Sequence, residues 1–291
     1  MSKFTIINLP SDGFGSLTEY ILGALFFAHK YNLEYMHTDL EILEHNNGVS
    51  NDIWLSTWNE RIQKIFLPDV KNSLEFKGLI TDINNLEIPC TYENTLFRLT
   101  NMAFLKQILD QEQNQNKLLR EIIINNFVNK TKSEIKDFKQ RAINIAVHIR
   151  KFMKTDIDPS SWRELYEKGN DVDIFFQNII KNLLIIFPNA FVHIYSQEER
   201  DVFNHFLDIS PNIYVYTDNS LMHDMVHLSH ADILVMSKGS YSRIANFYST
   251  GVKIIREKSL PILSDKTLYI SSSGNLTDEQ KSFILTNCSI I

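Results

Sequence analysis

The sequence has little of several residue types that mark non-globular or disulfide-rich proteins. Its 291 residues include only two cysteines, Cys90 and Cys288, together with 9 Gly and 7 Pro. Two cysteines cannot form a disulfide framework, and so few glycines and prolines exclude a collagen-like or low-complexity chain. We therefore expect a folded protein in a reducing compartment.

Long hydrophobic runs are also missing. The best apolar run covers residues 21–28, whereas a transmembrane helix needs about 20 residues. Residues 1–7 lack the apolar segment of a secretory signal peptide. We expect a cytoplasmic protein without a transmembrane segment.

An excess of positive charge is the third absence. The chain has 29 Lys and Arg against 35 Asp and Glu, which gives a formal net charge of −6. Nucleic-acid binding depends on broad electrostatic attraction to phosphates, so we expect no nucleic-acid partner. A local basic pocket for a small phosphate ligand remains compatible with this charge.

Apolar residues make up 44% of the chain, enough for a large buried core. At roughly 150 residues per domain the length favours two domains. The Lys- and Glu-containing stretch 130–141 is the best linker candidate, and we divide the chain into domains at 1–136 and 137–291.

The C-terminal half alternates short β-rich runs with segments of helical length. This rhythm predicts a mostly parallel sheet that binds its ligand at the carboxyl ends of the strands. The expected strands lie at residues 143–149, 191–195, 213–216, 233–236 and 252–255.

A glycine turn near the N-terminus is the first candidate ligand loop. Gly13, Phe14 and Gly15 separate a strand-like run at 4–9 from an amphipathic helix that we expect to begin at Ser16 with a capping box. Backbone N–H groups at such a helix start can receive an anion. The third glycine of a dinucleotide fingerprint is missing, and an ordinary strand-to-helix turn is an equally good interpretation.

Charged residues gather after the strand-like run 143–149. His148 and Arg150 lie at its end, and Lys154, Asp156 and Asp158 follow. A guanidinium group can bind a pyrophosphate in a bidentate manner and stabilise a negatively charged leaving group. The alternative is a solvated loop with a surface salt bridge.

The third candidate begins in a helix at Asp224, continues through the strand 233–236 and ends in a turn that contains Ser240 and Tyr241. This turn precedes another helix. Its N–H and hydroxyl donors are suited to holding phosphate without a metal ion.

A competing metal site lies in the same stretch. His223 and His227 have the H-x-x-x-H spacing of a zinc helix, and His230 adds a third imidazole. Zinc hydrolases of this pattern use Glu as the base beside the first His, whereas Asp224 is one methylene shorter. We expect histidines bonded to protein partners and no metal, and a zinc hydrolase is the least favoured function.

In the order of these motifs, the chain resembles the fucosyltransferase superfamily, which includes α-1,6-fucosyltransferases, nodulation-factor fucosyltransferases and protein O-fucosyltransferases. That group has an early glycine loop, a strand ending in H-x-R-R, and a D-x-x-x-L-S-x-x-D-x-x-V segment before a serine-rich turn. The corresponding residues here are 13–16, 148–151 and 224–240.

The resemblance implies a GT-B-like α/β fold, with two Rossmann-like domains facing across a cleft. The first domain would take the acceptor and the second would bind GDP-fucose. By this likeness the donor contacts would come from Gly13, Phe14, Gly15, His148, Arg150, Asp224, Ser240 and Tyr241.

The implied reaction is an inverting, metal-independent transfer of fucose from GDP-fucose to a hydroxyl group of a glycan or protein. Arg150 would stabilise the leaving GDP, with Lys154 nearby and Asp158 or Asp156 as the base. Lys151 stands where the family has a second arginine. Two alternatives stay open: another nucleotide sugar as donor, and an inactive nucleotide- or carbohydrate-binding protein.

Overall fold

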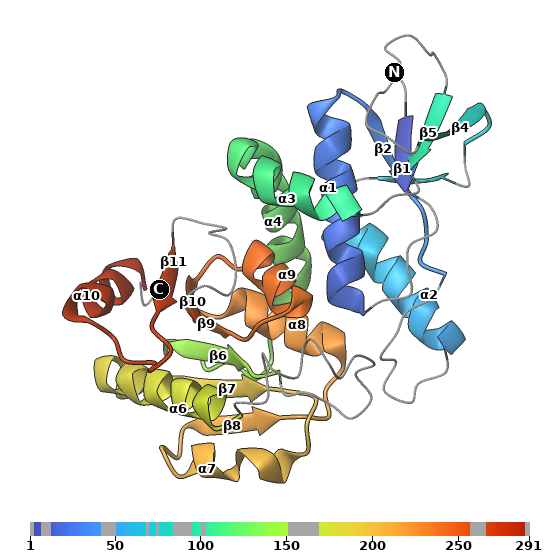
Figure 1. Ribbon diagram of the computed structural model, residues 1–291. Helices are drawn as coiled ribbons and strands as arrows, with labels where there is room; N and C mark the ends of the chain where they lie inside the picture. The colour runs from blue at the N-terminus through green and yellow to red at the C-terminus, as the bar shows by residue number, and fades with distance from the viewer. Residues whose placement is uncertain are drawn as a thin grey trace. The chain divides into compact units, whose positions relative to one another are not determined.

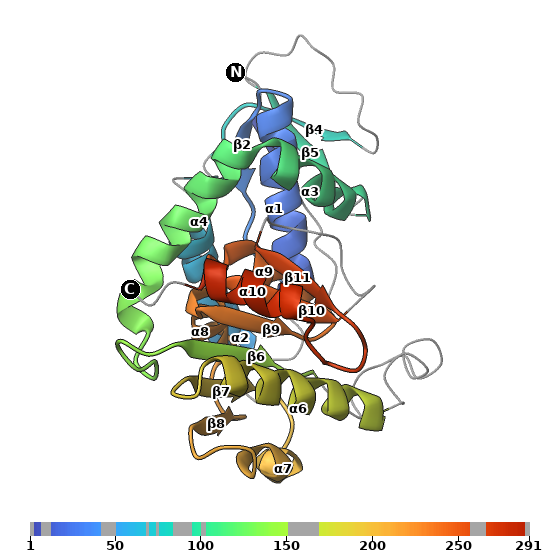
Figure 2. The same ribbon diagram turned by 90° about the vertical axis from the view of Figure 1, so that its left-hand side faces the viewer.

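The computed structural model describes residues 3–6, 13–41, 51–67, 70–73, 76–83, 95–99, 103–150, 169–256 and 266–288. The chain divides into two compact units, Met1–Lys130 and Thr131–Ile291. Each unit has its own parallel sheet with helices packed around it, as Figure 1 and Figure 2 show. None of the helices in the described part of the chain is long and apolar enough to cross a membrane.

The first unit has a five-stranded sheet in the order β3-β2-β1-β5-β4, and its strand pairs are parallel. Its elements are β1 (Lys3–Ile6), α1 (Phe14–Lys30), β2 (Glu34–His37), α2 (Asn51–Arg61) with a π-helical turn η1 (Ile62–Phe66), β3 (Lys71–Asn72), β4 (Leu79–Ile83), β5 (Thr95–Leu99), α3 (Ala103–Gln115) and α4 (Lys117–Thr131).

Helix α1 is buried along most of its length and packs closely on α3. A Cβ atom on Gly23 would lie 2.2 Å from the carbonyl oxygen of Leu105, so only glycine permits this approach. The helix begins at Phe14, two residues before the expected start, and within the described residues its N-terminus has no side-chain cap. The predicted capping box is wrong because Gly13 is the N-cap, so Ser16 lies inside the first turn of the helix and cannot cap it. Glu19 forms an ion pair with Lys106, with Nζ 3.1 Å from Oε2.

The second unit has a six-stranded parallel sheet in the order β11-β10-β9-β6-β7-β8. Its elements are η3 (Lys132–Glu134), β6 (Asn144–His148), α6 (Gly169–Ile186), β7 (Phe191–Tyr195), η4 (Arg200–Phe203), α7 (Asn204–Leu207), β8 (Ile213–Tyr216), α8 (Leu221–His230), β9 (Ile233–Met236), α9 (Ser240–Tyr248), β10 (Val252–Arg256), β11 (Thr267–Ile270) and α10 (Asp278–Asn287). The five strands expected in this half are confirmed, and β11 is a sixth.

The sheet of the second unit reverses its direction of growth beside β6. From β6 the chain adds β7 and β8 on one side, and then returns to the other side with β9, β10 and β11. Numbered within the unit from β8, the strand order is 3-2-1-4-5-6, the doubly wound arrangement of dinucleotide-binding folds. The carboxyl ends of β6 and β9 therefore form the topological switch point.

The two faces of this sheet carry different side chains. On β6, Val147 joins a hydrophobic cluster with residues of α6 and α10, such as Ile180 and Ile284. The alternate residue His148 points to the opposite face, where it contacts α9. Polar side chains therefore occur on the face that α9 covers.

Candidate functional site

The candidate site lies where β6 and β9 end. The two strands are neighbours, with Ile145 paired with Ile233 and Val147 with Val235. In parallel sheets a ligand binds beyond the carboxyl ends of the strands at the switch point. Here these ends lead into His148–Arg150 and into the turn 237–239 before α9.

Gly239 shapes the turn between β9 and α9. Its backbone has φ 114° and ψ 161°, a conformation that residues with a side chain rarely adopt. A Cβ atom at this position would lie 3.9 Å from Cδ of Arg150, so the Arg150 side chain passes beside the glycine. The structure thus brings Arg150 to the turn that precedes Ser240.

Helix α9 adds a second group suited to anions. It begins at Ser240, and its first backbone hydrogen bond at this end runs from the Arg243 N–H to the Gly239 carbonyl, at 3.2 Å. The first N–H groups of a helix point outward along the axis and carry partial positive charge. The Arg150 side chain, through its Cδ atom, and a helix N-terminus therefore come together at one strand end.

His148 is held in place by α9. Its Nδ1 lies 2.5 Å from Oγ of Ser242, and its ring centre lies 5.2 Å from that of Tyr241. Burial, with a contribution from the charge of Arg150, lowers the pKa of His148 to about 3. The imidazole is therefore neutral near pH 7 and can act as a hydrogen-bonding group rather than a cation.

Tyr241 connects the first turns of α9 and α8. Its hydroxyl donates a hydrogen bond to the carbonyl oxygen of Leu221 at 2.5 Å, so this donor is used within the protein. Asp224 lies in the first turn of α8 and is 7% exposed. Burial raises the pKa of Asp224, although a hydrogen bond with His223 opposes the shift.

The N-terminal glycine turn has a different character. Gly13 has φ −71° and ψ 157°, ordinary extended backbone. Phe14 is 2% exposed, and its ring stacks on Trp58 with centroids 3.8 Å apart. Gly15 is buried in the first turn of α1. A ligand at this turn would therefore meet the backbone of Phe14 and not its side chain.

The expected catalytic pair, Lys154 and Asp158, lies outside the described residues, as do Asp156 and Lys151. Their assignment stays a prediction from the sequence.

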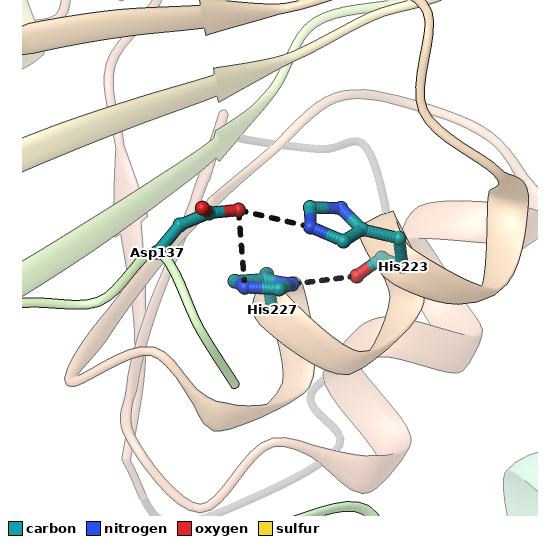
Figure 3. Close-up of side chains that lie close together, drawn as sticks. All are labelled: Asp137, His223 and His227. Atoms are coloured by element: carbon teal, nitrogen blue, oxygen red, sulfur yellow. Dashed lines mark hydrogen bonds and ion pairs between the residues drawn. The ribbon is translucent and has the colours of Figure 1, made fainter. Parts of the chain in front are cut away.

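The histidines of α8 form a separate cluster with Asp137 (Figure 3). Oδ2 of Asp137 lies 2.9 Å from Nε2 of His223 and 3.6 Å from Nε2 of His227. His230 is not part of it, because its Nε2 lies 2.7 Å from Oγ1 of Thr131. A hydrogen bond with Asp224 raises the pKa of His223, whereas burial lowers that of His227.

Asp137 was missed as a partner because it lies 86 residues before His223, in the stretch expected to be a solvated linker. Instead, from Thr131 onward this stretch is part of the second unit. The ring of Phe138 is 5.1 Å from that of His227 and 4.9 Å from that of His193. Phe138 is the one aromatic residue in this charged stretch. A large apolar ring in such a stretch indicates that part of it is buried against the fold.

No protein-family model matches the chain, and a search of the curated proteins finds no match. Structures of fucosyltransferases do match it over most of its length. The fucosyltransferase NodZ from Bradyrhizobium is 11% identical, with 86% of this chain and 94% of that chain covered and a TM-score of 0.38.

Two ligand complexes also match. NodZ α-1,6-fucosyltransferase soaked with GDP-fucose is 10% identical over 86% of this chain and 93% of that one, with a TM-score of 0.38. POFUT1 in complex with GDP-fucose is 11% identical over 86% and 96%, with a TM-score of 0.46.

Proposed function

We propose that the protein is a glycosyltransferase that binds a nucleotide sugar at the switch point of the second unit. One observation carries this proposal. The Arg150 side chain lies beside Gly239 at the N-terminus of α9, where a doubly wound sheet binds its ligand. A diphosphate fits this combination of a planar cation and helix N–H groups.

GDP-fucose is the proposed donor, on the strength of the motif resemblance. Arg150 and Ser240 would bind the diphosphate, with the backbone at Tyr241, while His148 and Asp224 would lie near the guanine or ribose. The neutral state of His148 suits this role, since it can accept or donate one hydrogen bond. The proposal includes a facing arrangement of two Rossmann-like domains around a cleft.

The proposed reaction is a single displacement with inversion. A hydroxyl group of a glycan or protein attacks the anomeric carbon of fucose, and the bond from that carbon to the GDP oxygen breaks. The hydroxyl proton passes to a carboxylate, Asp158 or Asp156, and Lys154 adds positive charge nearby. Arg150 stabilises the charge that develops on GDP, so no metal is needed at the diphosphate.

A binding protein without catalysis is the second candidate. It is favoured by Lys151, which replaces a bidentate arginine with a point charge. It is also favoured by the Tyr241 hydroxyl, whose donor is used on Leu221.

The first experiment is a melting-temperature panel with GDP, GDP-fucose, GDP-mannose and UDP-glucose. A ligand at 100 times its dissociation constant adds about 2.7 kcal/mol to the free energy of unfolding. Stabilisation by GDP and GDP-fucose is expected. Absence of any shift with guanine nucleotides would contradict the proposal, and a larger shift with UDP-glucose would change the donor.

Turnover then separates the two candidates. Arg150→Ala should keep its fold and lose about 3 to 4 kcal/mol of transition-state stabilisation, roughly 10²- to 10³-fold in kcat. Arg200→Ala, which removes an exposed arginine from η4, is the matched control and should retain kcat. A wild-type chain that binds GDP-fucose without transfer or hydrolysis would favour the binding protein.

A further inference from the structure

We propose that Asp137, His223 and His227 bind a divalent transition-metal ion of the Zn²⁺ type. This site goes beyond the transferase proposal and does not depend on it. The three residues each offer one ligand atom, and these atoms lie within 4.8 Å of one another. Figure 3 shows both imidazole rings directed at the same carboxylate oxygen of Asp137.

The fold explains why the two imidazoles come together. His223 and His227 are four residues apart on α8, so their side chains lie on one face of the helix. Their rings are stacked with centroids 4.0 Å apart. Two histidines one turn apart on a helix are a recurrent zinc-binding arrangement, and Asp137 supplies the third ligand from the segment before β6.

His227 provides the decisive observation. Its Nδ1 lies 2.8 Å from the carbonyl oxygen of His223, which can only accept, so Nδ1 carries the proton. In the neutral ring Nε2 then has a lone pair. This atom is buried and has no hydrogen-bond partner among the residues that the structure describes.

The lone pair on Nε2 of His227 faces a carboxylate oxygen, an arrangement that a bound cation would stabilise. The His227 side chain is 0% exposed, and its Nε2 lies 3.6 Å from Oδ2 of Asp137, longer than a hydrogen bond. A nitrogen lone pair and a carboxylate oxygen that face each other are mutually repulsive. A metal ion bound to both removes the repulsion and satisfies the buried nitrogen.

His223 has the matching arrangement. Its Nδ1 lies 3.5 Å from Oδ1 of Asp224, and its Nε2 faces Asp137. Histidines that bind metals usually donate their other ring N–H to a carboxylate or a backbone carbonyl. Asp224 and the His223 carbonyl would provide these two acceptors, one for each imidazole.

The donor set favours a particular class of ion. Two imidazoles and one carboxylate suit Zn²⁺, with Zn–N and Zn–O bonds of about 2.0 to 2.2 Å, and leave a fourth position for water. The alternative without metal is a protonated His223 between Asp137 and Asp224. That state explains His223 but leaves the lone pair of His227 facing a carboxylate.

The test uses the full chain without a histidine tag, freed of metal with EDTA and then of EDTA by dialysis. Zn²⁺ is titrated by calorimetry, and Co²⁺ by its visible absorption bands. We expect one saturable ion per chain and a rise in melting temperature with Zn²⁺.

Three variants locate the ion. His227→Gln and Asp137→Asn should lose saturable binding and the rise in melting temperature. His230→Gln is the control on the same helix, since His230 bonds with Thr131, and it should bind one ion as the wild type does. Binding that persists undiminished in both site variants would overturn the proposal, as would a wild-type chain that binds no Zn²⁺ at micromolar concentration.

If the site variants do not fold, the wild-type chain still decides. Histidine ring ¹⁵N spectra should show Zn²⁺-dependent shifts at Nε2 of two histidines whose Nδ1 stays protonated. Spectra that do not respond to Zn²⁺, with both ring nitrogens of His223 protonated, would establish the metal-free ion pair and refute the site.

Discussion

The two units both have a parallel sheet and a glycine turn between a strand and a helix, but the two turns differ in what surrounds them. In both, a strand inside a parallel sheet leads to a glycine and then to a helix, at Gly13 before α1 and at Gly239 before α9. In the first unit the next residue, Phe14, is part of the hydrophobic core. In the second, Gly239 borders Arg150. The topology thus provides a possible site, and the side chains at the strand ends determine whether that site can bind a ligand.

The largest expected effect tests the apolar character of the first turn. Phe14→Ala should lower the free energy of unfolding of the first unit by about 3 to 5 kcal/mol, because it removes a buried ring stacked on Trp58. Urea denaturation followed by tryptophan fluorescence measures this loss. Phe14→Leu, which keeps most of the volume, should cost less, and a loss below about 1 kcal/mol for the alanine variant would show that the ring is not a core contact.

The second effect contrasts the two glycines directly. Gly239→Ala should cost about 1 to 3 kcal/mol, because alanine is strained at φ 114°. Gly13→Ala should change stability by less than about 0.5 kcal/mol, because φ −71° suits any residue. Denaturation of both variants side by side measures the difference, and equal costs would remove the distinction between the turns.

The smallest expected effect near pH 5.5 is a pH dependence in the second unit. The pKa of His148 is about 3 in the folded chain and near 6.5 when unfolded, so the unfolded state binds the proton first. Stability therefore falls as the pH drops through 6.5 and continues to fall towards 3. By pH 5.5 the loss should be about 1.4 kcal/mol.

The matched histidine of the first unit is His37, whose pKa burial lowers to about 4. The contribution of neutral His37 to the free energy of unfolding should begin to fall as the pH drops through 6.5. It should stop falling near pH 4, where the folded state also binds the proton. Denaturation from pH 7 to 4 compares the wild type with His148→Gln and His37→Gln. A His148→Gln variant whose pH dependence equals that of the wild type would show that this imidazole is not buried in the neutral form.

The strands of the second unit could be predicted because each is a short β-rich run separated by helix-length segments. Strand β11 was not recognised, since Thr267–Ile270 is a four-residue edge strand and only Ile270 is fully buried. Within residues 32–100 no sequence pattern indicates the order of the strands. The strands there are two to five residues long, and their order depends on pairing with β1, which no local pattern encodes.

The site residues expected from the sequence stay predictions, and the patterns that indicate them are local. Arg150, Asp224 and Ser240 were singled out because they follow strands or open helices. Ser242 was not, although it holds His148, because its role depends on how α9 is rotated against the sheet. Asp137 was not recognised either, since long-range pairing brings it to α8.

The hydrogen bond from Tyr241 to Leu221 joins the starts of two helices. If a ligand at the turn before α9 displaces Tyr241, the first turn of α8 must follow or this bond breaks. That turn carries Asp224, the neighbour of His223. If the proposed diphosphate and metal sites both bind their ligands, occupancy of one would then influence the other, and thermodynamic linkage requires the influence to be equal in both directions.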